Sequence, residues 1–359
     1  MNIAKQIVRT SLAVTDKDIV RVSASPHTLE LGFQVAQEVE RAGAELLFTL
    51  WGDPLFLTEM REVADEYLTR EPRVERQLAE IETAEIHLAG IEDPRVFDKA
   101  TPAKMRLGAE HQQAIEERKR QRGVRSAFVE LSLVTPQRAR KYGISYPKWK
   151  RLVNAALAGN LNTIRNKGQL VAKNLDGAPT IRITGLGTNL TLDCTGRTCV
   201  VEDGIVDSAD IQRGFPYTSL PTGYVAIAPD EDSVNGRLTL DPFPLWGKWV
   251  KGATWEFKDG KLVSMHAAQN EKVMKAVYEG GTGDKDRFGY LTIGLNPKAE
   301  PLGAFIDSLV PGTLGISLGA NEALGGQNRG TSAIGAAIRG TTIRTDGFEL
   351  VKDGKLRVR

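Results

Sequence analysis

The chain has 359 residues, of which 41% are hydrophobic and 26% charged, a composition typical of globular proteins. Its 47 basic and 45 acidic residues leave a formal net charge of +2, so the chain as a whole is not suited to electrostatic binding of nucleic acid or membrane. Two cysteines argue against a disulfide-stapled fold, and no apolar leader or run of about 18 apolar residues occurs, so we expect a cytoplasmic protein.

The first half of the sequence alternates short apolar runs with amphipathic segments. Strands are predicted at residues 19–24, 44–51, 84–89 and 125–133. Helices are predicted at residues 26–42, from residue 53 onward, at 102–122 and, as one or two helices, at 146–174. Because the predicted strands are apolar, this alternation favours a parallel sheet covered by helices on both faces.

The pattern changes after Pro179, where short strands of alternating polarity replace the helices. They are predicted at residues 180–184, 190–194, 199–202, 238–240, 254–258 and 261–266. Residues 194–199 (CTGRTC) and 257–262 (FKDGKL) are predicted hairpin turns, and the first makes Cys194 and Cys199 cross-strand neighbours. We therefore predict two domains, an α/β domain at residues 1–177 and an antiparallel, glycine-rich α+β domain at 178–359.

Two glycine-rich segments, residues 220–241 and 311–337, are where we expect the functional site. Both are poor in aliphatic runs and rich in Asn, Asp, Glu and Ser. Glycine lets the backbone approach a ligand closely, and loops on a rigid scaffold commonly carry function.

Sequence signals for several kinds of chemistry are missing. The four histidines, at positions 27, 87, 111 and 266, show no ligand spacing, so we predict no metal site and no cofactor. There is no phosphate-binding loop and no G-x-S-x-G nucleophile elbow. The mixed-charge run at residues 116–122 (EERKRQR) is interpreted as a solvated helix face, so no nucleic-acid partner is expected.

Five short motifs resemble those of a known enzyme family. They are LPTGYVAIAP…VNG at residues 220–236, GTNL at 187–190, RFGYLTIGLNP at 287–297, GTLGISLG at 312–319 and GGQNRGTSAIGAA at 325–337. As a set they resemble the aminopeptidase T / aminopeptidase S family of two-metal exopeptidases, the thermophilic metallo-aminopeptidases. A relative with the same architecture is 2,5-dihydroxypyridine dioxygenase. The resemblance implies a thermophilic-aminopeptidase-like fold and a homodimer.

The residues that ligate metal in that family are replaced in this sequence. The resemblance places Tyr224 and Tyr290 at two glutamate ligands and Gly315 at a histidine ligand. The family's last histidine and aspartate become small residues, either Ala333 and Gly335 or Gly335 and Ala337. Neither alternative leaves a metal ligand at these positions.

We expect a site built from the replacements. Glu322 aligns with a family tyrosine, so it is the candidate general base, with Tyr224 and Tyr290 as donors to a developing oxyanion. The candidate substrate-binding residues are Asn189, Asn328, Arg329, Ser332 and Arg344. This interpretation predicts a metal-independent hydrolase or lyase of small-molecule catabolism, acting on a small polar molecule such as an amide or a heterocycle.

Two alternatives stay open. Under the first, the protein is a non-catalytic pseudoenzyme (a pseudopeptidase) that binds a small ligand or a protein partner through the vacated site. Under the second, it retains metallo-aminopeptidase activity. The loss of the ligand positions favours the first over the second, because two-metal hydrolysis depends on those ligands.

Overall fold

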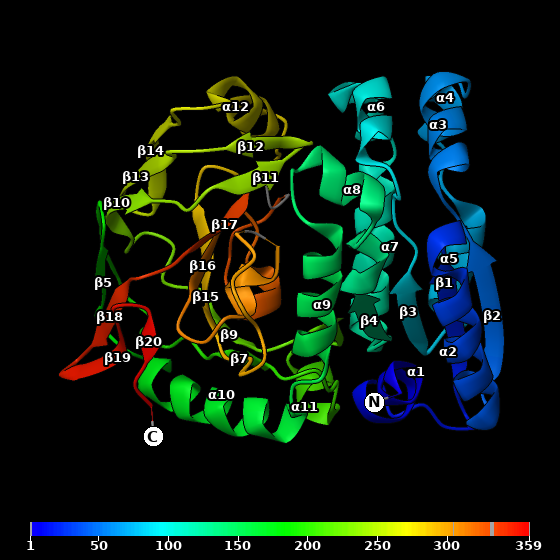
Figure 1. Ribbon diagram of the computed structural model, residues 1–359, viewed down its shortest axis with the longest axis horizontal. Helices are drawn as coiled ribbons and strands as arrows, with labels where there is room; N and C mark the ends of the chain where they lie inside the picture. Colours follow the sequence, from blue (N-terminus) through cyan, green and yellow to red (C-terminus); the bar gives the residue numbers. More distant parts are fainter. Residues whose placement is uncertain (1, 304, 331–333, 359) are drawn as a thin grey trace. The chain divides into compact units, whose positions relative to one another are not determined.

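The computed structural model describes residues 2–303, 305–330 and 334–358 (Figure 1). The chain divides into two compact units, each assembled from two segments. Unit 1 comprises Met1–Arg151 and Gly204–Leu220, and unit 2 comprises Leu152–Asp203 and Pro221–Arg359. The domain boundary near Gly177 stays a prediction, because compactness does not establish which part of a chain folds alone.

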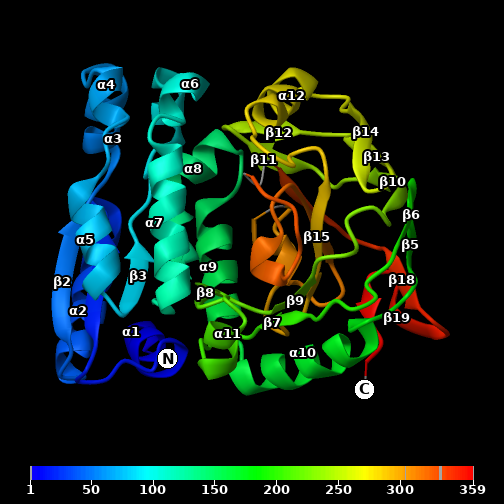
Figure 2. The ribbon, with the colours of Figure 1, turned by 180° about the vertical axis from the view of Figure 1, so that it is seen from behind.

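Unit 1 is built on a parallel sheet, as the alternating pattern predicted. Within the described residues the strand order is β2-β1-β3-β4-β8. The strands are β1 (Ile19–Ala24), β2 (Glu45–Leu50), β3 (Ala84–Leu88), β4 (Arg125–Val129) and β8 (Tyr217–Leu220). The α-helices are α1 (Ile3–Lys5), α2 (Leu29–Arg41), α3 (Asp53–Arg61), α4 (Asp65–Leu68), α5 (Arg73–Ile81), α6 (Pro102–Met105), α7 (Ala109–Arg122), α8 (Pro136–Lys141) and α11 (Ser208–Gln212). Helix α2 packs against β1 and β2, and α5 packs against α7 (Figure 2).

Two predicted elements of unit 1 differ from the observed ones. The single helix predicted at residues 102–122 is two helices, because Gly108 between α6 and α7 has a φ of 77°, which interrupts a right-handed helix. The strand predicted at 125–133 ends at Val129, and the short 3₁₀ helix η4 (Glu130–Leu133) follows it.

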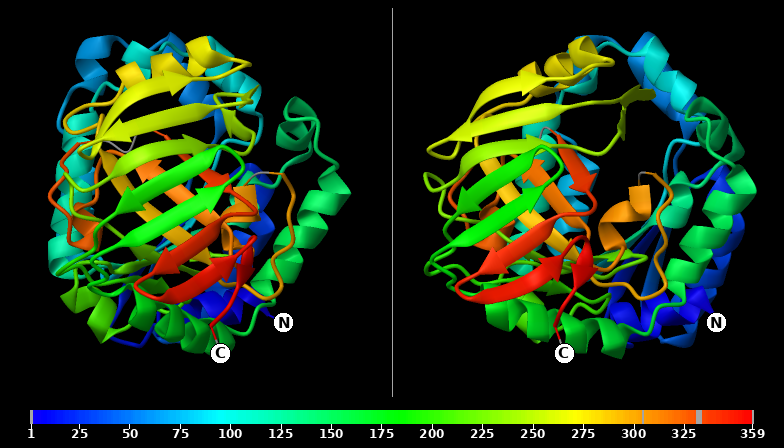
Figure 3. Two further views of the ribbon diagram at one scale, coloured as in Figure 1. Left: turned by 90° about the vertical axis from the view of Figure 1, so that its left-hand side faces the viewer. Right: turned by 60° about the vertical axis from the view of Figure 1, so that its left-hand side comes forward.

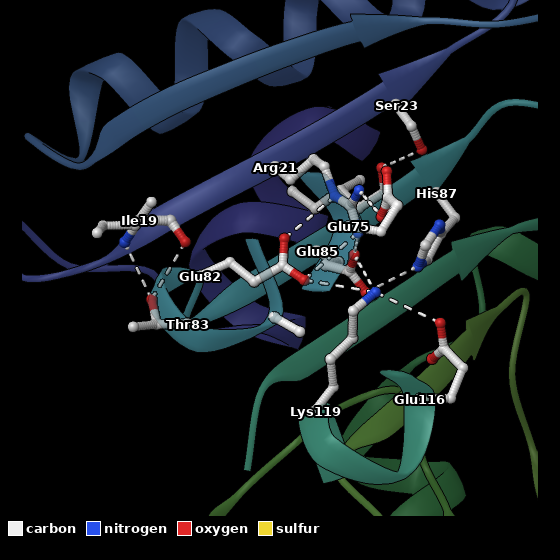
Figure 4. A network of polar contacts seen from close by, with 12 residues as sticks. Ile19, Arg21, Ser23, Glu75, Glu82, Thr83, Glu85, His87, Glu116 and Lys119 are labelled. Carbon is white, nitrogen blue, oxygen red and sulfur yellow. Dashed lines mark hydrogen bonds and ion pairs between the residues drawn. The ribbon is translucent and has the colours of Figure 1, made fainter. Parts of the chain in front are cut away.

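A buried ion network joins strands and a helix of unit 1 (Figure 4). Arg21 of β1 and Lys119 of α7 lie among the carboxylates of Glu82 and Glu85, and each of the four side chains is at most 10% exposed. Lys119 Nζ lies 2.8 Å from Glu85 Oε1, and Arg21 Nε lies 3.1 Å from Glu82 Oε2. The two positive and two negative charges balance, so none of them is buried without a partner.

Unit 2 is built on two larger antiparallel sheets and a small two-stranded one, β11 (Phe243–Leu245) with β12 (Lys248–Val250). Among the described residues, eight strands form one sheet: β14 (Lys261–His266), β13 (Thr254–Lys258), β10 (Asn235–Thr239), β6 (Thr188–Leu192), β5 (Ile181–Gly185), β18 (Thr342–Thr345), β19 (Phe348–Lys352) and β20 (Lys355–Leu356). Five form the other: β17 (Gly335–Ile338), β16 (Leu314–Leu318), β15 (Phe288–Gly294), β9 (Tyr224–Ile227) and β7 (Val200–Glu202). The remaining helices are α9 (Tyr146–Leu157), whose residues fall in both units, α10 (Leu161–Leu175) and α12 (Glu271–Glu279).

The core of unit 2 lies between its two large sheets, and Figure 3 shows the eight-stranded sheet in front of the five-stranded one. Ile183 and Leu190 of the larger sheet are fully buried in the same cluster as Leu291 and Leu314 of the smaller one. Burying one face of each sheet leaves the opposite face of the five-stranded sheet available for other side chains.

One predicted hairpin of unit 2 is confirmed and the other is wrong. FKDGKL joins β13 to β14, with Asp259 and Gly260 at positive φ in the turn. CTGRTC does not join paired strands, because β6 belongs to the eight-stranded sheet and β7 pairs with β9 in the other. Cys194 and Cys199 are buried thiols whose pKa values are raised by burial, so they are unreactive.

In the described part of the chain, no helix is both long enough and apolar enough to cross a membrane. The homodimer stays a prediction.

Candidate functional site

The candidate site lies on the face of the five-stranded sheet that is turned away from the core. Side chains alternate between the two faces of a strand, and directly paired residues share a face. The register pairs Tyr224 with Gly294, and it aligns Thr292, Gly315 and Ala337 across three strands. The residues between these positions, such as Val225, Leu291 and Ile316, belong to the core.

A cavity of about 460 Å³ opens on this face. The positions that the resemblance assigns to metal ligands line it: Tyr224, Tyr290, Gly315, Gly335 and, under the second reading of the last motif, Ala337. Ala333, the remaining position under the first reading, lies outside the described residues. Its volume falls within the range of roughly 300–1,000 Å³ that is usual for small-molecule sites. The positions that the resemblance assigns to metal ligands therefore border a hollow.

Small residues form the floor of the cavity. Thr292 stands opposite Gly315, and Tyr290 stands opposite Ser317 in the β15–β16 ladder. A Cβ atom on Gly315 would lie 2.3 Å from Thr292 Oγ1, so the threonine hydroxyl occupies the place where a side chain at position 315 would begin. Thr292 and Ser317 are buried, and their hydroxyl groups make this floor polar.

Two carboxylates, those of Asp241 and Asp307, also line the cavity. Asp307 is 3% exposed, and its carboxylate accepts hydrogen bonds from the backbone N–H groups of Leu302 and Gly303 at 2.7 and 3.0 Å. Arg339 Nε donates to Asp241 Oδ2 at 2.6 Å, and Arg339 Nη1 lies 3.8 Å from Asp307 Oδ2. Arg339 thus interacts strongly with Asp241 and only weakly with Asp307.

Burial raises the pKa of Asp307 above its usual value, and the negative charge of Asp241 acts in the same direction. The two backbone hydrogen bonds and Arg339 act in the opposite direction without cancelling the effect of burial. The loop that carries Asp307 is conformationally unusual, because Phe305, which lines the cavity, has a φ of 58°. Asp307 is therefore the lining carboxyl whose proton affinity is raised.

Glu322 does not share the cavity with the two tyrosines, contrary to the expectation that the three surround one site. It begins the short 3₁₀ helix η6 (Glu322–Leu324), its side chain is 41% exposed, and it is not a lining residue. Arg329, whose side chain is 84% exposed, lies 3.3 Å from it and is likewise outside the cavity. Matching Glu322 to a family tyrosine by sequence alone therefore did not place it at the site.

The remaining predicted binding residues do not meet at the cavity either. Asn189 is an exposed residue of β6 in the eight-stranded sheet. Arg344 is an exposed residue of β18 and pairs with Glu349 at 2.7 Å. Asn328 is buried, and its side chain donates to the backbone of Phe288 and Gly319. Ser332 lies outside the described residues.

The retained motifs have a structural role that explains part of the resemblance. Gly223 has a φ of 124°, and a Cβ atom there would lie 2.9 Å from the Cβ of Asn296, so the two motifs that contain these residues pack backbone against backbone. Asn296 is fully buried and donates to the backbone of Ala156 and Thr222. These hydrogen bonds hold the ends of strands in place whether or not the site is catalytic.

Sequence reasoning missed Asp307 and included Asp241 only as the last residue of the glycine-rich segment 220–241. Asp307 is the one charged residue in the mostly apolar stretch AFIDSLV at residues 304–310. A lone carboxylate in such a stretch is a signal that a buried acid has a specific partner or function, because an unpaired buried charge is costly. Distinguishing it from a loop residue required knowing that this segment borders the cavity.

The residues at the cavity do not fit the two-metal centre that the resemblance implies. Phenols, glycines and alanine stand at the ligand positions, Asp241 is engaged by Arg339, and Asp307 is engaged by two backbone N–H groups. Throughout residues 2–303, 305–330 and 334–358, no three His, Cys, Asp or Glu side chains are grouped so that they could hold a metal ion. We therefore derive no chemical step through a metal.

Comparison with known proteins supports the architecture. Wild-type AmpT from Thermus thermophilus has 16% sequence identity and a TM-score of 0.67, over 99% of this chain and 98% of that one. The 2,5-dihydroxypyridine dioxygenase from Pseudomonas putida KT2440 has 12% identity and a TM-score of 0.66, over 99% of this chain and 96% of that one. No curated protein matched the chain by sequence. The family model for thermophilic metalloproteases (M29) matches residues 1–289, and the chain belongs to that family.

Proposed function

We propose that the protein is a metal-independent hydrolase or lyase that acts on a small polar molecule, an amide or a heterocycle, in the cavity of unit 2. The observation that carries the proposal is that an acid with raised proton affinity, Asp307, lines a hollow together with Tyr224 and Tyr290. The family supplies the aminopeptidase-like scaffold. The chemistry is assigned from the residues at the cavity.

Asp307 takes the acid–base role that the sequence suggested for Glu322. Burial raises the pKa of Asp307, and a raised pKa makes a carboxylate a better proton acceptor than an ordinary aspartate. Its two backbone hydrogen bonds hold the carboxylate in one orientation at the cavity wall. Glu322, exposed and outside the lining, has no such position.

For an amide, the proposed hydrolysis balances without a further reactant besides water. The Asp307 carboxylate accepts a proton from water as the water oxygen bonds to the carbonyl carbon, and the carboxyl then returns this proton to the leaving nitrogen as the C–N bond breaks. The Tyr224 and Tyr290 hydroxyl groups donate hydrogen bonds to the carbonyl oxygen as it gains negative charge. The phenols thus supply donors where the family has acidic ligands.

The alternative function, a pseudoenzyme that binds a small ligand without converting it, is favoured by a different observation. Both lining carboxylates already accept hydrogen bonds within the protein. Asp241 accepts from Arg339, and Asp307 accepts from two backbone N–H groups. If these contacts persist with ligand bound, the acids serve to shape the cavity and transfer no proton.

A thermal-shift screen of small amides, heterocycles and carboxylic acids, followed by product analysis of each hit, distinguishes the two functions. The proposal predicts that at least one hit is consumed, that a hydrolysis or elimination product appears, and that exhaustive dialysis against a chelator leaves the rate unchanged. Hits that stabilise the protein and are recovered unchanged after long incubation would overturn the enzymatic function in favour of the binding one.

A further inference from the structure

A second cavity, of about 260 Å³, lies wholly within unit 1. It is lined by segments that follow three parallel strands: residues 27–34 after β1, Glu92 after β3, and residues 131–136 after β4. Strand β1 lies between β2 and β3 in the sheet. The chain therefore runs from β1 to β2 on one side of β1, and then crosses to β3 on its other side. In open parallel sheets, ligands bind at the carboxyl ends of strands at such a topological switch point.

Hydrogen bonds between the strand-end loops hold this cavity open. Ser25 Oγ donates to the carbonyl of Gly90 and accepts from its N–H, both at 2.9 Å. Thr28 Oγ1 donates to the carbonyl of Leu88 at 2.8 Å. The loops after β3 and β4 also approach closely, since a Cβ atom on Gly90 would lie 3.2 Å from the carbonyl oxygen of Ser132. The cavity is therefore a preformed feature of the fold.

His27 presents a hydrogen-bond acceptor that has no protein partner. Its Nε2 lies 2.8 Å from the carbonyl oxygen of Ser132, and because a carbonyl cannot donate, Nε2 carries the proton. Nδ1 of the neutral ring then carries a lone pair. Nδ1 is buried, and among the described residues nothing donates to it. A buried acceptor in this condition is suited to a donor supplied by a ligand.

The other polar residues of the cavity favour a ligand that donates hydrogen bonds. Among the described lining residues, Glu30 and Glu92 contribute two carboxylates and Lys150 is the one cation. Glu92 Oε1 accepts a hydrogen bond from Gln137 at 2.6 Å, which leaves Oε2 for a ligand donor. Lys150 Nζ lies 5.9 Å from the centre of the Tyr146 ring, and both residues line the cavity. A phosphate ester would meet two negative charges and a lone pair, so the site disfavours it despite its position at the start of a helix.

We propose that this cavity binds a small uncharged ring compound with hydroxyl or amino donors, the chemistry of a nucleoside or a free sugar, and rejects its phosphate ester. The ligand donates to His27 Nδ1 and to the carboxylate of Glu92, and its ring packs on Tyr146 and the apolar residues Leu131 and Val134. At about 260 Å³ the cavity lies just below the range of roughly 300–1,000 Å³ that is usual for drug-sized ligands, which limits its ligand to a small ring compound. The proposal rests on unit 1 alone and does not depend on the function proposed for unit 2.

Calorimetric titration of the full chain with adenosine, ribose and adenosine 5′-monophosphate tests the proposal. We expect adenosine or ribose to bind with a Kd of about 1 mM or tighter, and the monophosphate to bind at least about tenfold more weakly than adenosine. Comparing adenosine with ribose distinguishes a nucleoside from a free sugar. Failure of both to bind at about 10 mM, or tighter binding of the monophosphate, would overturn the proposal.

Variants locate the binding in unit 1. His27→Gln keeps an N–H donor for Ser132, but its amide oxygen does not reproduce the position of the imidazole Nδ1 acceptor. Glu92→Gln removes one carboxylate. Each substitution should weaken binding by about tenfold. Glu30 is exposed, so Glu30→Gln leaves the fold intact and should reduce the preference for adenosine over its monophosphate.

Two control variants lie outside this cavity. Glu80→Gln breaks an exposed ion pair, and Tyr290→Phe lies in the cavity of unit 2, so both should leave the affinity for adenosine and ribose unchanged. Binding in the cavity of unit 1 would be contradicted if the affinity for adenosine or ribose were unchanged in both His27→Gln and Glu92→Gln. A weaker affinity in Tyr290→Phe would contradict it as well.

Discussion

Thr292 and Gly315 face each other across neighbouring strands, and the threonine hydroxyl stands 2.3 Å from the point where a Cβ atom on Gly315 would lie. The resemblance of residues 312–319 to a motif of the metallo-aminopeptidases places a metal-binding histidine at Gly315. A polar group from the neighbouring strand therefore stands where a side chain at this position would begin. The floor of the cavity is thus defined by a specific contact between Thr292 and Gly315.

The first prediction concerns this pair. Gly315→Ala should destabilise the protein by about 1–2 kcal/mol, because the new methyl group forces the Thr292 side chain to move. Thr292→Ala in the same chain should recover part of that loss. Urea unfolding of the two single variants and the double variant gives the coupling energy, which we expect to exceed about 0.5 kcal/mol. Strictly additive effects would contradict the contact.

The second prediction concerns metal. Because phenols and small residues occupy the ligand positions, Gly315→His alone should not create a metal site. Elemental analysis of the wild type and of Gly315→His, each after incubation with zinc or cobalt and desalting, should find far less than one metal ion per chain. Hydrolysis of leucine peptides should not be stimulated by cobalt. One zinc, iron, manganese or cobalt ion per wild-type chain would refute the account of the site.

The third prediction concerns the buried ion network of unit 1. Lys119→Met removes one of two cations and leaves Glu82 and Glu85 with insufficient compensation, so it should cost about 3–5 kcal/mol of folding stability. The matched control is Arg118→Gln, one residue earlier on α7, which breaks an exposed ion pair with Glu80. That variant should leave stability nearly unchanged. Equal effects of the two substitutions in chemical denaturation would show that burial of the network has no energetic importance.

The fourth prediction concerns pH. Burial raises the pKa of Glu130 from 4.5 to about 7, so the folded chain holds this proton more tightly than the unfolded chain does. The contribution of Glu130 to stability is therefore present at low pH and is lost as the pH rises from about 4.5 to about 7. Glu130→Gln should raise Tm by a few degrees at pH 8 and change it little at pH 4. A Tm difference that is the same at both pH values would contradict the burial of this carboxyl.

Sequence patterns predicted the supporting structure better than the site. The bounds of β1 and the FKDGKL hairpin follow from local residue patterns, so they were predicted closely. Tyr224 and Tyr290 were predicted together because their motifs are recognisable strand by strand. Glu322 was misplaced because it begins a short 3₁₀ helix outside the paired strands, where a match by sequence does not show which way the side chain points.

The break at Gly108 and the separation of β6 from β7 depend on tertiary packing that a local pattern does not encode. Asp307 was missed for a related reason. Its stretch has the composition of a core segment, and its raised pKa arises from burial against residues that are distant in the sequence. Chemistry that depends on such distant neighbours is visible once the fold is known.

The most direct test of the central claim compares Asp307→Asn with Glu322→Gln, using whichever substrate the screen identifies. Asparagine keeps an oxygen that accepts the hydrogen bonds from Leu302 and Gly303 but transfers no proton, so turnover should fall by about a hundredfold or more while the protein stays folded. Glu322→Gln, outside the cavity, should leave turnover unchanged. Undiminished turnover in Asp307→Asn, or a large loss in Glu322→Gln, would contradict the assignment of acid–base chemistry to the vacated cavity.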